Sequence, residues 1–115
     1  MTAEFPRQRS VYLSRALKQS GDTKKRPVVV VSINIRNQYS STVLVVPFSS
    51  DVSQVANPSR ILIKQEGGLN LDSVAMCDVL TCIKKQYLEP KPYGEISLET
   101  FERIVQGIQI AIGIY

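Results

Sequence analysis

The sequence predicts a small, mainly β domain in which a mostly antiparallel barrel is packed against one C-terminal helix. Short apolar runs separated by turn residues recur between residues 11 and 83, and the last segment changes to helical spacing. Several short strands followed by a terminal helix are typical of this architecture. With 115 residues, of which 43% are hydrophobic, the chain suits a single core. We therefore expect residues 1–115 to form one domain.

The strongest strand signal lies in the first third of the chain. Residues 1–9 have the composition of a loose arm, and Val11–Leu13 predicts a short first strand. The run Pro27–Val31 contains four consecutive valines between polar residues. Such a run predicts a fully buried strand, which we place at residues 26–34. The polar residues on either side, 14–25 and 35–41, predict a loop and a turn.

The middle of the chain alternates between apolar runs and turn residues. Thr42–Phe48 predicts a second apolar strand, and Pro47 near its end predicts a sheet edge or a bulge there. The elements predicted after it are a loop or short helix from residue 49 to 53, a strand at 60–64, a turn at 66–69, one long strand or two strands joined at a bend at 73–83, and a connection at 84–94.

The C-terminal segment has the pattern of an amphipathic helix over residues 97–112. Ser97 is a suitable N-cap, and Glu99 and Glu102 are placed favourably in the first turns. The apolar residues that follow helical spacing are Phe101, Ile104, Val105, Ile108, Ala111 and Ile112.

The composition excludes several kinds of catalytic site. The chain has no histidine, so Ser-His-Asp and Cys-His catalysis and His-containing zinc sites are ruled out. Two cysteines, Cys77 and Cys82, cannot complete an all-thiolate zinc site. We expect both to be small buried hydrophobic residues without a disulfide. Chemistry in this chain must use Arg, Lys, Ser, Thr, Tyr or carboxylates.

The net charge of +4 is unevenly distributed. Residues 1–40 carry eight cations and two anions, whereas residues 41–115 carry six cations and eight anions. A basic first part favours a polyanionic partner, either nucleic acid or an acidic protein segment, although a merely solvated surface is the alternative. No apolar run is long enough to span a bilayer, and the N-terminus lacks a signal core, so we expect a cytoplasmic protein.

The two valine-rich strands bring an arginine and a hydroxyl together. If they pair antiparallel about a turn centred between Asn37 and Gln38, then Arg26 meets Ser49 across the ladder. A bulge would shift the pairing and bring in Ser50. An arginine fork beside a hydroxyl can hold a phosphodiester. The alternative is an ordinary surface arginine near two loop serines.

Several blocks of sequence resemble the MazF/PemK/Kid family of toxins in their order and spacing. The blocks are Arg26–Ser32, Asn37, Thr42–Ser50, Glu66–Leu69, Asp72–Val74 and Ile112–Ile114. The resemblance implies an SH3-like antiparallel β-barrel with a C-terminal helix, usually a homodimer. It also implies an endoribonuclease that cuts single-stranded RNA at a short sequence without metal or cofactor. The implied protein partner is an antitoxin whose acidic, initially disordered tail covers the active site.

The resemblance also implies roles for individual residues. The catalytic pair falls on Arg26 and Ser49, and Thr23, Lys24, Lys25 and Ser50 are expected to bind RNA. The 2′-hydroxyl of RNA would attack the adjacent phosphorus and leave a 2′,3′-cyclic phosphate and a 5′-hydroxyl. Arginine is effectively never deprotonated, so Arg26 is expected to stabilise charge rather than act as the base.

The sequence departs from the family pattern in two regions. Gln8-Arg9-Ser10 replaces the usual Arg-Gly-Asp, and Asp78–Thr81 replaces a common Glu-Gln-Ile-Arg. Val79 and Thr81 cannot make the hydrogen bonds of Gln and Arg, so we expect altered base reading here. Two alternatives remain open: a non-catalytic toxin that targets gyrase, as the related CcdB does, and a degenerate member that only binds an acidic partner.

Overall fold

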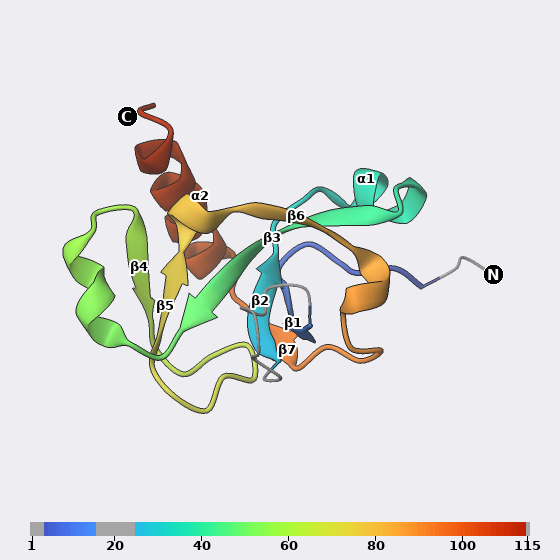
Figure 1. The fold of residues 1–115 in the computed structure, drawn as a ribbon, viewed down its shortest axis with the longest axis horizontal. Helices are drawn as coiled ribbons and strands as arrows, with labels where there is room; N and C mark the ends of the chain where they lie inside the picture. Colours follow the sequence, from blue (N-terminus) through green and yellow to red (C-terminus); the bar gives the residue numbers. More distant parts are fainter. Residues whose placement is uncertain (1–3, 16–24, 115) are drawn as a thin grey trace.

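One curled antiparallel sheet and one long helix make up the fold (Figure 1). The computed structural model describes residues 4–15 and 25–114, and within these ranges seven strands follow the order β4-β5-β3-β2-β1-β7, with β6 also paired to β3. Most of the loop predicted at 14–25 lies outside the described residues. The strands are β1 (Ser10–Ser14), β2 (Arg26–Val30), β3 (Thr42–Ser49), β4 (Arg60–Ile63), β5 (Ser73–Met76), β6 (Thr81–Lys84) and β7 (Gly94–Glu95).

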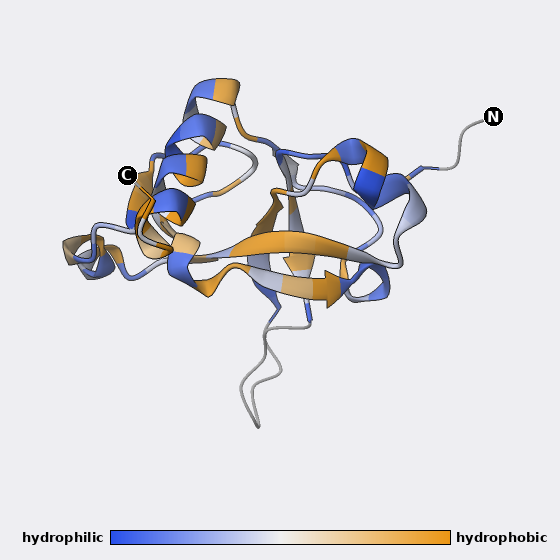
Figure 2. Cartoon of the chain, turned by 90° about the horizontal axis from the view of Figure 1, so that it is seen from above, coloured by the Kyte–Doolittle hydropathy of each residue, from blue (hydrophilic) through white to orange (hydrophobic). Residues whose placement is uncertain are grey.

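Five helical segments connect or cover these strands within the described residues. They are α1 (Asn34–Tyr39), α2 (Leu98–Ala111) and the short 3-10 turns η1 (Val52–Ala56), η2 (Cys77–Val79) and η3 (Lys85–Tyr87). Figure 1 shows α2 beside β4 and β5, and Figure 2 shows apolar residues along the strands and on one side of α2. The half-barrel with a C-terminal helix confirms the predicted fold class.

Strand β2 is buried on both faces, as its valine run predicts. Val28 and Val30 point into a cluster with Tyr12 and Leu88, whereas Val29 points to the opposite face. There it joins a larger apolar core beneath α2. Because alternate residues of a strand face opposite sides, a continuous apolar run supplies both cores at once. The larger core contains Val11, Val29, Val46, Phe48, Ile63, Leu69, Ala75, Cys77, Ile96 and Ile104.

The predicted pairing of β2 with β3 is confirmed, but the connection between them is not a simple turn. Val28 pairs with Pro47 and Val30 with Val45, which is the predicted register. The strand ends at Val30 rather than at residue 34, and α1 replaces the turn predicted at 35–41. The fully buried Asn37 explains this difference. Its amide donates to the Ser32 carbonyl at 2.8 Å and holds the chain in a local turn instead of a longer strand.

The N-terminal arm is held down over its described part, which corrects the expectation of a loose segment. The Asn37 amide donates to the Pro6 carbonyl at 3.0 Å. Gln8 donates from its backbone to the Asn34 side chain at 2.8 Å and from its amide to the Val31 carbonyl at 2.9 Å. These bonds join residues far apart in sequence, so no local pattern could predict them.

Pro47 lies inside the sheet rather than at its edge. On one side of β3, pairing with β6 ends at Val45 and pairing with β5 begins at Phe48. The proline therefore occupies a break between two partner strands, where a missing N–H group costs no ladder bond. The segment predicted as one long strand or two is two strands, β5 and β6, joined by η2.

Helix α2 begins as predicted, with Ser97 as its N-cap. The Ser97 hydroxyl accepts from the Thr100 N–H at 3.1 Å, and Glu66 accepts from the Ser97 N–H at 2.9 Å. The turn that carries Glu66 contains Gly67 and Gly68, both with positive φ, a conformation that favours glycine. This turn therefore links the helix start to the sheet.

The two cysteines have different environments. Cys77 is buried in the main core, and burial raises the pKa of its thiol to about 12. Cys82 is exposed, contrary to the expectation that both are buried, because it lies on a side of β6 that faces outward. Neither forms a disulfide. Within residues 4–15 and 25–114, every helix is too short or too polar to cross a bilayer.

Candidate active site

Arg26 and Ser49 lie at the same end of the paired strands β2 and β3. The pairing of β2 with β3 ends at Val28 and Pro47, and Arg26 and Ser49 each lie two residues beyond that pair, at the same end of the two strands. Arg26 pairs with Ser14 of β1, which fixes its backbone at this end of the sheet. We call the cavity at this end the β2–β3 cleft; its volume is about 380 Å³. The described residues that line it are Arg26, Pro47, Phe48, Ser49, Gln54, Met76 and Val79.

A second, wider cavity of about 630 Å³ adjoins this cleft, and we call it the outer groove. Arg26 and Ser49 line it too, together with Lys25 and Ser50. The structure thus brings together four of the six residues predicted for the site. The other two, Thr23 and Lys24, lie outside the described residues.

The Ser49 hydroxyl is oriented by its own loop. Its oxygen accepts a hydrogen bond from the Asp51 N–H at 3.1 Å. A hydroxyl that accepts from the backbone still has its own O–H to donate. The arrangement therefore suits Ser49 to donate a hydrogen bond to an anionic oxygen held beside Arg26.

Asp51 is the carboxylate next to this loop, but its side chain caps the start of η1. Its side chain accepts from the N–H and the hydroxyl of Ser53, at 3.1 and 2.6 Å. These bonds lower the pKa of Asp51. A carboxylate with a lowered pKa is a weak proton acceptor, so Asp51 is a poor general base. No carboxylate lines either cavity among residues 4–15 and 25–114.

Lys25 pairs with the carboxylate of Glu89. Their side chains are 40% and 33% exposed, so the pair is only partly shielded from water. The Lys25 ammonium thus has a protein partner at the rim of the outer groove, and a phosphate would have to compete with Glu89 for it. Sequence reasoning missed this pairing because the two residues are distant in the chain.

Two further residues of the β2–β3 cleft, Gln54 and Met76, were missed by sequence reasoning, whereas Val79 belongs to the segment expected to alter base reading. The Oε1 atom of Gln54 is buried and has no hydrogen-bond partner within the described part of the chain. Val79 gives the cleft an apolar wall, and the Thr81 hydroxyl donates to the Val79 carbonyl at 2.6 Å. The Thr81 hydroxyl is therefore engaged within its own segment, and altered base reading at this segment stays a prediction.

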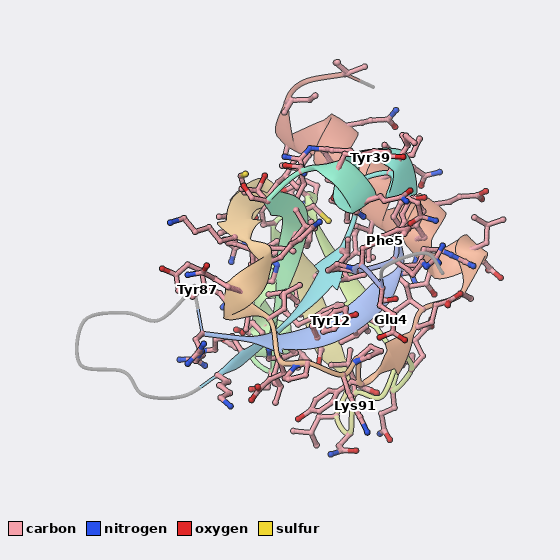
Figure 3. The ribbon with its side chains drawn as sticks, turned by 90° about the vertical axis from the view of Figure 1, so that its right-hand side faces the viewer. Glu4, Phe5, Tyr12, Tyr39, Tyr87 and Lys91 are labelled. Atoms are coloured by element: carbon pink, nitrogen blue, oxygen red, sulfur yellow. The ribbon has the colours of Figure 1, made fainter. Side chains whose placement is uncertain are left out.

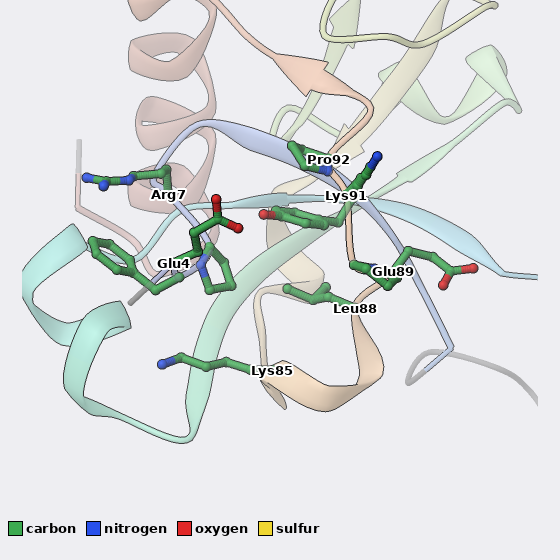
Figure 4. A pocket seen from close by; sticks show the side chains of 11 residues that line it. Glu4, Arg7, Lys85, Leu88, Glu89, Lys91 and Pro92 are labelled. Atoms are coloured by element: carbon green, nitrogen blue, oxygen red, sulfur yellow. The ribbon is translucent and has the colours of Figure 1, made fainter. Parts of the chain in front are cut away.

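A larger cavity, which we call the arm cavity, lies between the N-terminal arm and residues 85–92 (Figures 3 and 4). Its volume is about 670 Å³, and it contains neither Arg26 nor Ser49. Burial, assisted by the charge of Glu4, raises the pKa of Tyr12 in its wall. Tyr12 is only 8% exposed and packs in a core cluster, so its ring is not free to stack on a base. The arm cavity is larger than the other two, but we do not choose it as the candidate active site. Its charged residues are of both signs, so it is not specific for an anion such as a phosphate.

Comparisons with known proteins agree with the fold. The family model for PemK-like, MazF-like toxins of type II toxin–antitoxin systems matches residues 7–112. The structure is similar to the toxin MazF-mt6 of Mycobacterium tuberculosis, with 20% identity, a TM-score of 0.76 and coverage of 93% of this chain and 99% of that one. It is also similar to an endoribonuclease from a Mycobacterial species, with 20% identity, a TM-score of 0.78 and coverage of 99% and 97%.

A third similar structure is a MazE–MazF complex from Deinococcus radiodurans, with 15% identity, a TM-score of 0.75 and coverage of 98% of this chain and 100% of that one. At these identities the structural likeness shows the fold, whereas the family model spans almost the whole sequence. The chain therefore belongs to the PemK-like, MazF-like toxin family of type II toxin–antitoxin systems.

Proposed function

We propose that this chain is an endoribonuclease that cuts single-stranded RNA without a metal ion. The observation that carries the proposal is that Arg26 and Ser49 line the same two cavities at the paired ends of β2 and β3. Membership of the toxin family supports it. The chemistry also suits a chain without histidine, because RNA supplies its own nucleophile.

In the proposed reaction, the 2′-oxygen attacks the adjacent phosphorus and the bond from phosphorus to the 5′-oxygen breaks. The 2′-oxygen loses its proton, and the 5′-oxygen gains one. The products are a 2′,3′-cyclic phosphate and a 5′-hydroxyl. Arg26, a permanent cation, stabilises the charge that develops on the phosphate oxygens, and Ser49 donates to a non-bridging oxygen.

The proposal includes the partners of the chain. Similar structures contain an endoribonuclease with its cognate antitoxin and a MazE–MazF complex. We infer that residues 1–115 act as one cytoplasmic toxin domain, form a homodimer, and are inhibited by an antitoxin with an acidic segment. The cations Lys25 and Arg26 at the outer groove would attract such a segment as they attract RNA.

The test is to incubate the purified protein with a long single-stranded RNA in the presence of EDTA. We expect discrete fragments that end in cyclic phosphate, and no cleavage of DNA of the same sequence, which lacks the 2′-hydroxyl. Arg26→Ala should abolish the fragments. Lys64→Ala is the matched control, because Lys64 is a surface cation with a 77% exposed side chain outside both cavities.

Three results would contradict the proposal. If Arg26→Ala cleaves as well as the wild type, then the site is elsewhere. If the wild type produces no fragments but traps gyrase on DNA, then the chain is a gyrase-targeting toxin instead. Binding of an acidic antitoxin peptide without either activity would identify a degenerate member of the family.

A further inference from the structure

The outer groove continues beyond the candidate active site. Leu13 and Tyr93 line both the outer groove and a third cavity of about 420 Å³, which we call the Tyr93 groove. The other described residues of the Tyr93 groove are Glu89, Pro90 and Lys91. The shared residues make the two cavities neighbours, so a chain molecule bound at Arg26 has a path onward past the Tyr93 ring.

Tyr93 presents an exposed ring on a backbone that is held from two sides. Tyr93 is 51% exposed. Its N–H donates to the Val11 carbonyl at 2.7 Å. On the other side, the Tyr93 backbone packs closely on Gly68. A Cβ atom added to Gly68 would lie 2.5 Å from the Tyr93 carbonyl oxygen. An aromatic ring on a fixed backbone loses little freedom when it binds a flat partner.

Lys91 supplies a cation to the lining of the Tyr93 groove. It lies between Pro90 and Pro92, so the ring constraints restrict the backbone on both sides. Lys91 lines both the Tyr93 groove and the arm cavity, and Figure 4 shows the end of its side chain directed away from Glu4 and Lys85. Among the described residues, the outer groove and the Tyr93 groove together carry three cations, Lys25, Arg26 and Lys91, and one anion, Glu89.

We propose that the Tyr93 groove is a flanking subsite for single-stranded RNA, in which a base stacks on Tyr93 and a nearby phosphate contacts Lys91. This inference rests on the proposed endoribonuclease function. An aromatic face next to cations is the common device for binding single strands, and stacking tolerates any base. The subsite therefore adds affinity for longer substrates without changing the sequence that is cut.

The test compares three substrates after the cut sequence has been mapped on a long RNA. One oligonucleotide spans only the cut sequence, and the other two are extended by several nucleotides, one on the 5′ side and one on the 3′ side. For wild type we expect a lower KM on one extended substrate. Tyr93→Ala should raise that KM about tenfold, the order expected for loss of one stacked base, with little change in kcat. Its KM for the short substrate, which lacks the flanking base, should rise much less than its KM for the extended substrate.

Three matched variants sharpen the test. Tyr93→Phe should restore the low KM, because it keeps the ring. Lys91→Ala should weaken binding of the extended RNA and reduce its salt dependence. Tyr39→Ala should have no effect, because Tyr39 is 77% exposed on α1 and does not line either groove.

The subsite and the proposed activity can fail separately. Binding of a fluorescent RNA, measured by anisotropy, reports on the Tyr93 groove even if no RNA is cleaved. If Tyr93→Ala changes the KM of the short and extended substrates equally, or leaves RNA binding unchanged, then the subsite does not exist. If Tyr93→Ala weakens the binding of an acidic peptide but not the binding of RNA, then the groove binds protein instead of RNA.

Discussion

Lys25, at the rim of the outer groove, is ion-paired with Glu89, which lies on the connection between η3 and β7. Glu89 is also fixed to the end of β1, because its N–H donates to the Leu13 carbonyl at 2.9 Å. An acidic residue thus stands beside cations expected to bind RNA, and it competes with phosphate for Lys25.

The first prediction concerns this competition. Glu89→Gln should tighten binding of single-stranded RNA by about two- to fivefold, because it releases Lys25 and removes one negative charge at the groove. The dependence of affinity on salt should also steepen, as expected for one more phosphate contact. Fluorescence anisotropy over a salt series measures both. Glu99→Gln, on the exposed start of α2, removes the same charge elsewhere and should have a smaller effect. Equal effects of the two variants would mean that only net charge matters.

The second prediction concerns the Ser49 hydroxyl. Ser49→Ala should lower kcat for RNA cleavage by about a hundredfold, the order expected when one donor to a developing negative charge is removed. Ser49→Thr should keep most of the activity, because it retains the hydroxyl. Single-turnover cleavage of a mapped substrate measures the rate. If Ser49→Ala retains the wild-type rate, then the hydroxyl has no part in the reaction.

The third prediction concerns the packing of α2. Gly107 faces the core so closely that a Cβ at this position would lie 2.6 Å from the Cys77 Sγ atom. Gly107→Ala should therefore destabilise the fold by about 1–3 kcal/mol from overpacking, offset in part by the higher helix propensity of alanine. Urea unfolding measures the free energy. Adding Cys77→Ala removes the sulfur and should recover part of the loss; a Gly107→Ala protein as stable as the wild type would show that the helix can shift freely.

The fourth prediction is a pH dependence of stability. Arg60 donates to both carboxylate oxygens of Asp78 at 3.0 Å, and this lowers the pKa of Asp78 below its ordinary 3.8. A lowered folded-state pKa means that the stabilisation is complete above the unfolded-state pKa and is lost as the pH falls through the folded-state value. Asp78→Asn should cost about 1 kcal/mol at pH 7, since both side chains are partly exposed.

This difference should shrink below about pH 4. Thermal unfolding of wild type and Asp78→Asn from pH 2 to pH 7 tests it, with Asp72→Asn as the control, because Asp72 makes a longer pair with the 77% exposed Lys64. A gap between wild type and Asp78→Asn that stays constant over this pH range would show that Asp78 acts through packing rather than charge.

The sequence by itself determined strands β1 to β6, the terminal helix and the pairing of β2 with β3, but not the short strand β7, which begins at the end of the predicted connection. The valine run of β2 and the helical spacing after Ser97 are local patterns, and each reports directly which faces are buried. The register was predicted from a symmetric pairing about a turn centred between Asn37 and Gln38, and it is confirmed although α1 occupies that connection. From that register alone, Arg26 could be placed opposite Ser49.

Only the tertiary structure decided the connections and the surroundings of the site. Helix α1 replaces the predicted turn because Asn37 finds partners on Ser32 and on the distant Pro6. The pairing of Lys25 with Glu89, and the placing of Tyr93 between Val11 and Gly68, likewise join segments that are far apart in sequence. Such contacts depend on how the sheet curls, and the alternation of polar and apolar residues does not predict them.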